Sequence, residues 1–148
     1  MPQDKRSDPE ALLKSINKLE QQKNRGSLRI FFGMCPGVGK TYAMLKAAIE
    51  QKKNGLKIYI GTIDTHKRVE TEILTKELPI IPKKKIHYRD HILEEMNIDE
   101  ILELKPDLVL VDELAHSNAP GSRHSKRYQD VEEILNNGIN VYTTINVQ

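Results

Sequence analysis

A glycine-rich turn between a strand pattern and a helix pattern constrains this chain more than any other feature. The apolar run at residues 28–32 predicts a short buried strand, and residues 40–53 predict a helix that ends at Asn54-Gly55. Between them lies the segment Gly33-Met34-Cys35-Pro36-Gly37-Val38-Gly39-Lys40-Thr41. A strand, a glycine-rich turn and a helix in this order are the context that a phosphate-binding loop, or P-loop, requires.

The chemistry of such a turn depends on its backbone. Glycines allow the N–H groups to point inward, where they and the start of the next helix hold phosphate oxygens. We expect Lys40 to reach the β- and γ-phosphates of ATP or ADP, and the Thr41 hydroxyl to coordinate Mg²⁺. The strict motif has glycine where Met34 stands, so a glycine-rich turn with a chance Lys-Thr pair is the alternative. The predicted nucleotide-binding residues are Gly33, Pro36, Gly37, Val38, Gly39, Lys40, Thr41 and Tyr42.

Strand and helix patterns alternate along the rest of the chain. This alternation predicts an α/β fold of the P-loop NTPase type, a parallel sheet with helices on both faces. A helix that begins at Pro9 and ends before Arg25 precedes it. We expect an N-terminal segment at 1–26 and a nucleotide-binding domain at 27–148, together a fragment of a longer protein. Further strands are predicted at 56–60, 86–88, 108–111 and 139–144, and further helices at 67–78 (Val69, Ile73 and Leu74 on one face), 97–105 and 126–137.

Two acids follow the most apolar of these strands. Leu108-Val109-Leu110-Val111 is continuously apolar, as expected for a strand covered on both faces, and Asp112-Glu113 come next. This is the Walker-B arrangement that accompanies a P-loop. We expect Asp112 to hold Mg²⁺ directly or through water, and Glu113 to orient or deprotonate an attacking water or hydroxyl. A strand-end turn or helix cap is the alternative for Asp112, and Glu113 can be present without efficient hydrolysis.

Polar side chains also follow the second and the last of the predicted strands. In a parallel sheet these strand ends face the same crevice as the phosphate-binding turn. Asp64, His66 and Arg68 are therefore candidates for contacts with an acceptor or the nucleotide, with helix capping by Asp64 or Thr65 as the alternative. Thr144 and Asn146 are candidates to sense the γ-phosphate, or they form a turn.

A cation-rich loop lies close in sequence to the two acids. It reads Ser122-Arg123-His124-Ser125-Lys126-Arg127. Arg123 or Arg127 is a candidate to neutralise transition-state charge as an arginine finger. The alternative is a solvated loop or a docking surface.

Composition excludes several classes of protein. The net charge is only +2, with few aromatic residues and no tryptophan, which argues against a nucleic-acid partner. One cysteine allows no internal disulfide and fits a reducing compartment. No apolar run approaches the roughly 20 residues that span a bilayer, and the N-terminus lacks a signal-peptide core. We therefore expect a cytoplasmic domain that does not itself enter the membrane.

Several segments beyond the P-loop resemble the N-terminal domain of the KdpD family of osmosensitive, potassium-responsive sensor histidine kinases. The similarity covers nearly the whole chain beyond about residue 8. One departure is the turn Asp64-Thr65-His66-Lys67-Arg68, where the family usually has Glu-Thr-His-Gly-Arg. The segments that carry the resemblance are Phe31-Phe32-Gly33, Pro36 to Leu45, Val111 to His116, Asn118 to His124, Lys126 to Glu133, and Val141 to Gln148.

The resemblance implies the cytoplasmic input domain of a two-component sensor whose full-length members are inner- or plasma-membrane proteins. Such sensors control expression of a potassium-uptake pump, so the implied partners are the rest of the sensor and, indirectly, a response regulator and the pump system. The histidine-kinase core is absent here, so whether this chain is an enzyme stays open. His66, His87, His91, His116 and His124 are not expected to be the phosphoacceptor.

Three functions compete at this stage. The first is a regulatory module that binds Mg-ATP and changes conformation. The second is a phosphotransferase in which Glu113 activates a hydroxyl, such as a serine of a partner protein, or a slow ATPase. The third, an ATPase driven by nucleic acid, is disfavoured by the near-neutral charge.

Overall fold

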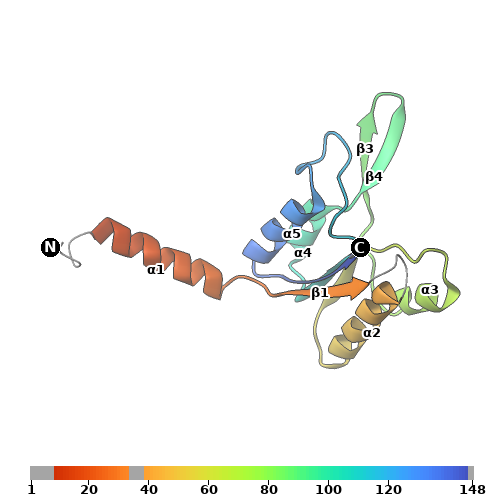
Figure 1. The fold of residues 1–148 in the computed structure, drawn as a ribbon, viewed down its shortest axis with the longest axis horizontal. Coiled ribbons are helices and arrows are strands. Elements are labelled where there is room, and N and C mark those ends of the chain that lie inside the picture. Colours follow the sequence, from red (N-terminus) through yellow and green to blue (C-terminus); the bar gives the residue numbers. More distant parts are fainter. Residues whose placement is uncertain (1–8, 34–38, 147–148) are drawn as a thin grey trace.

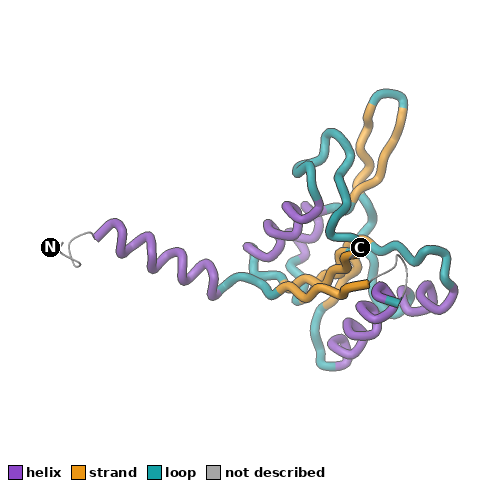
Figure 2. Tube along the Cα trace, viewed as in Figure 1, coloured by secondary structure: helices purple, strands orange, loops and turns teal. Residues whose placement is uncertain are grey.

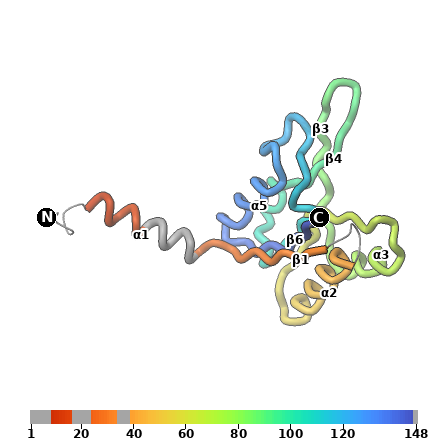
Figure 3. The backbone as a smooth tube through the Cα atoms, in the orientation of Figure 1, coloured from red at the N-terminus to blue at the C-terminus, as the bar shows by residue number. Residues whose placement is uncertain are grey.

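A computed structural model of the chain describes residues 9–33 and 39–146, and only the backbone of residues 17–23. Its centre is a four-stranded sheet in the order β1-β6-β5-β2. All three pairings are parallel, which confirms the predicted parallel sheet. Figure 3 shows β1 and β6, from opposite ends of the chain, side by side. The strands are β1 (Leu28–Gly33), β2 (Ile58–Thr62), β5 (Leu108–Val111) and β6 (Asn140–Asn146).

Helices cover both faces of this sheet (Figure 1). On one face, Leu108 and Leu110 of β5 pack with Met44 and Leu45 of helix α2 (Lys40–Lys53). On the other face, Val109 and Val111 pack with the helices that flank β5 in the sequence. Successive strand residues point to opposite faces, so burial on both sides explains the continuously apolar sequence of β5. The helices are α2 (Lys40–Lys53) and α3 (Val69–Thr75), then α4 (Ile98–Leu104) and α5 (Arg127–Asn136).

A β-hairpin that the sequence analysis largely missed projects from the sheet, as Figure 2 shows. It pairs β3 (Lys84–Tyr88) with β4 (His91–Glu95) in antiparallel register, whereas only a strand at 86–88 was predicted. Its turn is Arg89-Asp90, with Arg89 at φ 55°. The usual hairpin signal, Asn-Gly or Asp-Gly, is absent, so the pattern did not reveal the second strand.

Two predicted elements are displaced along the chain. β2 lies two residues later than the predicted 56–60, which carries its end to Thr62. α3 is shorter than the predicted 67–78, because Lys67 has a left-handed backbone and residues 76–78 close in turns. Of the three apolar residues predicted to share one face of this helix, Val69 and Ile73 are exposed and Leu74 packs partly buried against the core, while Thr71 is the buried residue of α3.

The N-terminal helix α1 (Pro9–Lys23) is present as expected and extends away from the sheet (Figure 1). Its side chains Leu12, Leu13 and Ile16 are exposed. In the described residues, no helix is both long enough and apolar enough to cross a bilayer.

Candidate functional site

The carboxylate of Asp112 is the centre of the site, at the carboxyl end of β5. The residue is only 2% exposed. Its Oδ2 accepts hydrogen bonds from the Thr41 hydroxyl at 3.2 Å and from the backbone N–H of Asp64 at 3.0 Å. Its Oδ1 accepts from the Thr144 hydroxyl and from the N–H of Glu113. Candidate residues from four separate segments of the sequence therefore meet at Asp112: Thr41, Asp64, Glu113 and Thr144.

Thr41 and Asp112 have the geometry of two ligands of one small cation. The Thr41 Oγ1 lies 3.2 and 3.4 Å from the two carboxylate oxygens, and both side chains are buried. Mg²⁺ prefers oxygen ligands at 2.0–2.1 Å in octahedral geometry, which places adjacent ligands about 3 Å apart. A hydroxyl and a carboxylate at this separation therefore fit Mg²⁺ without rearrangement of the backbone.

Lys40 and the start of α2 form the next part of the site. Gly39 precedes the helix with φ 70°, a left-handed conformation that favours glycine, and Lys40 is buried. Gly33 ends β1 on the other side of the turn. The predicted binding residues Pro36, Gly37 and Val38 lie outside the described residues. A cavity of about 290 Å³ is lined by Lys40, Glu113, Ala115, His116, Thr144, Ile145 and Asn146.

The backbone holds Glu113 in an unusual conformation. Its φ is 59°, in the left-handed region that costs a non-glycine residue free energy. Its N–H donates to the Thr144 hydroxyl at 2.9 Å, and the N–H of Leu114 donates to the Thr144 carbonyl at 2.9 Å. These bonds turn the Glu113 side chain away from the strand, where it is 38% exposed and borders the cavity beside Lys40.

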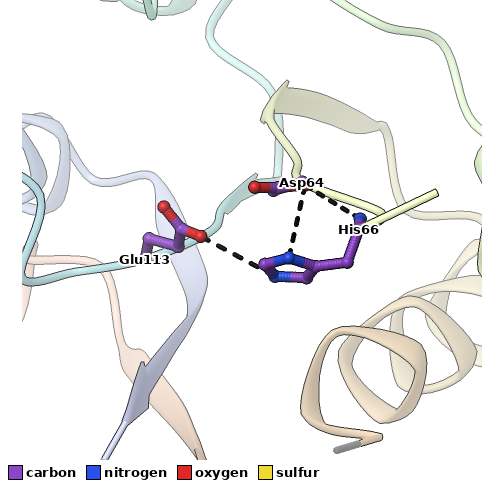
Figure 4. Close-up of side chains that lie close together, drawn as sticks. All are labelled: Asp64, His66 and Glu113. Atoms are coloured by element: carbon purple, nitrogen blue, oxygen red, sulfur yellow. Dashed lines mark hydrogen bonds and ion pairs between the residues drawn. The ribbon is translucent and has the colours of Figure 1, made fainter. Parts of the chain in front are cut away.

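The turn after β2 meets this acid from the opposite side (Figure 4). The Asp64 carboxylate accepts a hydrogen bond from the backbone N–H of His66 at 2.8 Å, so it closes a local turn. The His66 ring lies between the carboxylates of Asp64 and Glu113, at 3.8 and 3.9 Å. Neither Asp64 nor Thr65 caps α3, whose N-cap position is Arg68.

Arg68 and Tyr42 border a separate cavity of about 220 Å³. Gly39, Thr41 and His66 also line it, together with Thr65, Glu70 and Thr71. Tyr42 therefore lies beside Thr41, at the border of the site.

The two candidate arginines lie in different places. Arg127, the first residue of α5, is 5% exposed, and its Nη1 donates to the backbone carbonyl of Asp112 at 2.8 Å. It stands behind the acid, where it supports the strand end. Arg123 instead binds the carboxylates of Asp99 and Glu133. The structure therefore does not bring Arg123 to Asp112.

Sequence analysis missed the partners that hold Arg127. Glu95, at the end of β4, lies 3.5 Å from the Arg127 Nη2 and is nearly buried. It also contacts His116 Nε2 at 2.9 Å and accepts from the Ala119 N–H at 2.8 Å. No motif marked Glu95, because its role depends on the unpredicted hairpin.

Burial perturbs two groups of α5. Burial lowers the pKa of the Arg127 guanidinium, and the nearby carboxylates, Glu95 first, oppose that shift. Burial raises the pKa of Asp130, while a hydrogen bond from Asn118 opposes it. Of these two groups, Arg127 is the one that contacts the strand end, through the Asp112 carbonyl.

Comparison with known proteins assigns the family. Residues 24–148 match the family described as the osmosensitive K⁺ channel His kinase sensor domain, KdpD. The chain is 55% identical over 143 residues to the "Sensor protein KdpD" of Clostridium acetobutylicum and 48% identical over 143 residues to that of Escherichia coli K12. Each alignment covers 97% of this chain and 16% of the relative, so the chain spans about a sixth of their length. The chain therefore belongs to the KdpD family of sensor proteins, and its described residues form the α/β domain of that family.

Proposed function

We propose that this domain binds Mg-ATP, or ADP, as the regulatory input domain of a larger two-component sensor histidine kinase. The observation that carries the proposal is the convergence of the Thr41 hydroxyl on the buried Asp112 carboxylate, 3.2 Å apart, beside the buried Lys40. The order of elements supports it, because β1 leads through a glycine-rich turn into α2 as in P-loop NTPases. In this assignment β6 lies between the phosphate-binding strand β1 and the acid-bearing strand β5.

Each residue has a distinct task in this proposal. Backbone N–H groups of the turn and Lys40 hold the phosphate oxygens, and Thr41 and Asp112 hold Mg²⁺. The metal, when bound, supplies charge neutralisation for the phosphates. The Thr144 hydroxyl donates to the Asp112 carboxylate and accepts from the Glu113 N–H. A movement of the end of β6 would therefore shift both acids. Asn146 borders the same cavity and is a candidate contact to the γ-phosphate.

The wider role follows from the family. The relatives are named as sensor proteins and the family description specifies an osmosensitive K⁺ channel His kinase sensor domain. We propose that nucleotide binding favours one conformation of this domain and that the rest of the sensor, a membrane protein, reads it. Such a shift requires different nucleotide affinities in the two conformations. A response regulator and a potassium-pump system are then indirect partners, with the domain itself in the cytoplasm and away from nucleic acid.

A second function is phosphotransfer to a hydroxyl, including a protein serine, or slow ATP hydrolysis. The exposed carboxylate of Glu113 beside Lys40 favours it, because a general base must reach its acceptor. Asp64, His66 and Arg68 border neighbouring cavities on the same edge of the sheet and are candidate acceptor contacts.

Calorimetric titration with ATP and Mg²⁺ tests the binding proposal. Lys40→Ala removes a charged hydrogen-bond donor and is expected to weaken binding about 10- to 100-fold, from roughly 1.5–3 kcal/mol per charged bond. Asp112→Asn is expected to weaken binding only when Mg²⁺ is present. Lys53→Ala, at the exposed end of the same helix, is the matched control and retains affinity. Equal affinity in wild type and Lys40→Ala would refute a phosphate site at this turn.

Turnover separates the two functions. We would incubate the domain with γ-labelled ATP and Mg²⁺, alone and with sensor and pump proteins, and compare Glu113→Gln. Binding without label transfer or hydrolysis supports the regulatory module. Label on a protein serine that disappears in Glu113→Gln establishes the phosphotransferase instead.

A further inference from the structure

The side chains of Asp64, His66 and Glu113 gather at one point between the two turns (Figure 4). Each offers one nitrogen or oxygen ligand atom, and these three atoms all lie within 4.8 Å of one another. Asp64 and His66 come from the turn after β2, and Glu113 comes from the turn after β5. The cluster thus joins two segments that are far apart in sequence.

The three side chains do not satisfy one another by hydrogen bonds. The His66 Nδ1 is 3.8 Å from Asp64, and Nε2 is 3.9 Å from Glu113. Both distances exceed hydrogen-bond length. Ligands of one zinc-like ion lie about 2.0–2.2 Å from it, so two ligands of the same ion are about 3–4 Å apart. The two distances end at different ring nitrogens, so a single ion would take one nitrogen of His66 and one oxygen of each carboxylate, three atoms that all lie within 4.8 Å of one another.

A single ion would bind only one of the two His66 ring nitrogens. Binding requires the three ligand atoms to approach from within 4.8 Å to about 3–4 Å of one another, and the His66 and Asp64 side chains, 37% and 53% exposed, are not enclosed by packing. The other ring nitrogen then remains for a carboxylate, as in the carboxylate–histidine–metal arrangements that fix ligand orientation. Asp64 and Glu113 also border a cavity of about 290 Å³, which leaves room for the water ligands of an incomplete protein shell.

Charge and ligand type define the ion. The two carboxylates offer oxygen ligands and the imidazole offers a nitrogen ligand, a mixed set that suits a dication. The Arg127 guanidinium also interacts electrostatically with Glu113, but its contacts are to the Asp112 carbonyl and to Glu95. An imidazole ligand favours zinc and similar first-row transition metals over Mg²⁺ and Ca²⁺.

We propose that Asp64, His66 and Glu113 form a binding site for a first-row transition-metal dication of the Zn²⁺ class, separate from the Thr41–Asp112 pair. The ion links the turn after β2 to the turn after β5. One consequence rests on the proposed nucleotide function: a metal-bound Glu113 is no longer free to act as a base, so the ion restrains phosphate chemistry at the neighbouring site.

Calorimetry with Zn²⁺ on the chelator-treated full chain, without nucleotide, tests the site. We expect one ion per chain, with affinity at least tenfold weaker in His66→Ala and reduced in Asp64→Asn. His91→Ala, an exposed histidine on the hairpin, is the matched control and retains binding. Circular dichroism verifies that each variant is folded. Co²⁺ in place of Zn²⁺ provides a spectroscopic signature, since a histidine ligand changes its visible absorption bands.

Two outcomes overturn the proposal: unchanged Zn²⁺ affinity in His66→Ala, or Zn²⁺ binding that Asp112→Asn abolishes and His66→Ala does not. Lys40→Ala distinguishes this proposal from the nucleotide function. It is expected to lose ATP affinity and keep Zn²⁺ affinity. A chain that binds ATP but shows no zinc binding refutes the metal site alone, and the converse result refutes the nucleotide site alone.

Discussion

Two turns meet at the site, and they are built in opposite ways. The turn after β5 carries Asp112 and Glu113, and it is surrounded by buried groups: Arg127 is 5% exposed and Thr144 is fully buried. The turn after β2 carries Asp64 and His66, and both are exposed. A hydrogen bond from the Asp64 N–H to the Asp112 carboxylate joins the two turns.

The difference separates two tasks. The turn after β5 is held by side chains from β6, α5 and, through Glu95, the hairpin, so the Asp112 carboxylate has a fixed position. The turn after β2 has few buried contacts, and such segments open at low free-energy cost. A site with one fixed and one adjustable side can hold a ligand and also report its presence. The following predictions test whether the two turns differ in this way.

The largest expected effect comes from Arg127→Met. The substitution removes the hydrogen bond to the Asp112 carbonyl and leaves Glu95 buried without its guanidinium partner. Breaking a buried ion pair from one side costs about 3–5 kcal/mol, a large part of the stability of a single domain. Urea denaturation measures the free energy of unfolding.

Arg123→Ala is the control for this change. Arg123 also pairs with two carboxylates, but it is exposed, and surface pairs contribute only about 0–1 kcal/mol. Equal losses of stability in the two variants would contradict the idea that the buried contacts of Arg127 stabilise the domain more than the exposed contacts of Arg123.

A neighbouring pair of threonines on β6 gives a matched test. Thr144→Val removes the hydroxyl that donates to Asp112 and accepts from the Glu113 N–H, and we expect a loss of about 1–3 kcal/mol. Thr143 is equally buried, but in the described part of the chain its hydroxyl has no hydrogen-bond partner. Thr143→Val is therefore expected to be neutral or stabilising. Chemical denaturation of both variants is the measurement, and the idea is wrong if their effects are the same.

The smallest effect concerns the adjustable turn. Lys67 has φ 59°, and a left-handed backbone costs a non-glycine residue about 1 kcal/mol. Lys67→Gly relieves this cost, although glycine gains entropy in the unfolded chain, so we expect a net stabilisation of at most about 1 kcal/mol. Lys76→Gly, at φ −72°, is the control and is expected to destabilise. Thermal unfolding compares them, and destabilisation of similar size in both variants would contradict strain at Lys67.

The same residue explains a departure noted in the sequence. By the family resemblance, a glycine is expected where this chain has Lys67, and the local pattern did not explain that preference. The left-handed backbone supplies it, because glycine adopts this conformation without a steric penalty. The departure therefore concerns the backbone of the turn rather than a ligand contact of its side chain.

The central elements could be predicted because their signals are local. The apolar run of β5, the glycine-rich turn before α2 and the alternation of strands and helices each depend on neighbouring residues, and they indicated a parallel sheet with Asp112 at one strand end. The hairpin could not be predicted in full, since the Arg89-Asp90 turn lacks a glycine signal. The periodicity placed Val69, Ile73 and Leu74 on one face of α3 but could not show that only Leu74 of the three packs against the core, because a short helix can be covered over a small part of its surface.

The sequence by itself determined the parallel α/β sheet, the family resemblance, and the choice of Thr41 and Asp112 as residues of one candidate site, which the structure brings into contact. Only the tertiary structure decided which of the arginine and histidine side chains lie at the Asp112–Glu113 turn. It placed Arg127 behind Asp112, bound Arg123 to Asp99 and Glu133, and brought His66 between two acids. These outcomes depend on contacts between segments distant in sequence, and a local pattern carries no information about which buried charge will meet which partner.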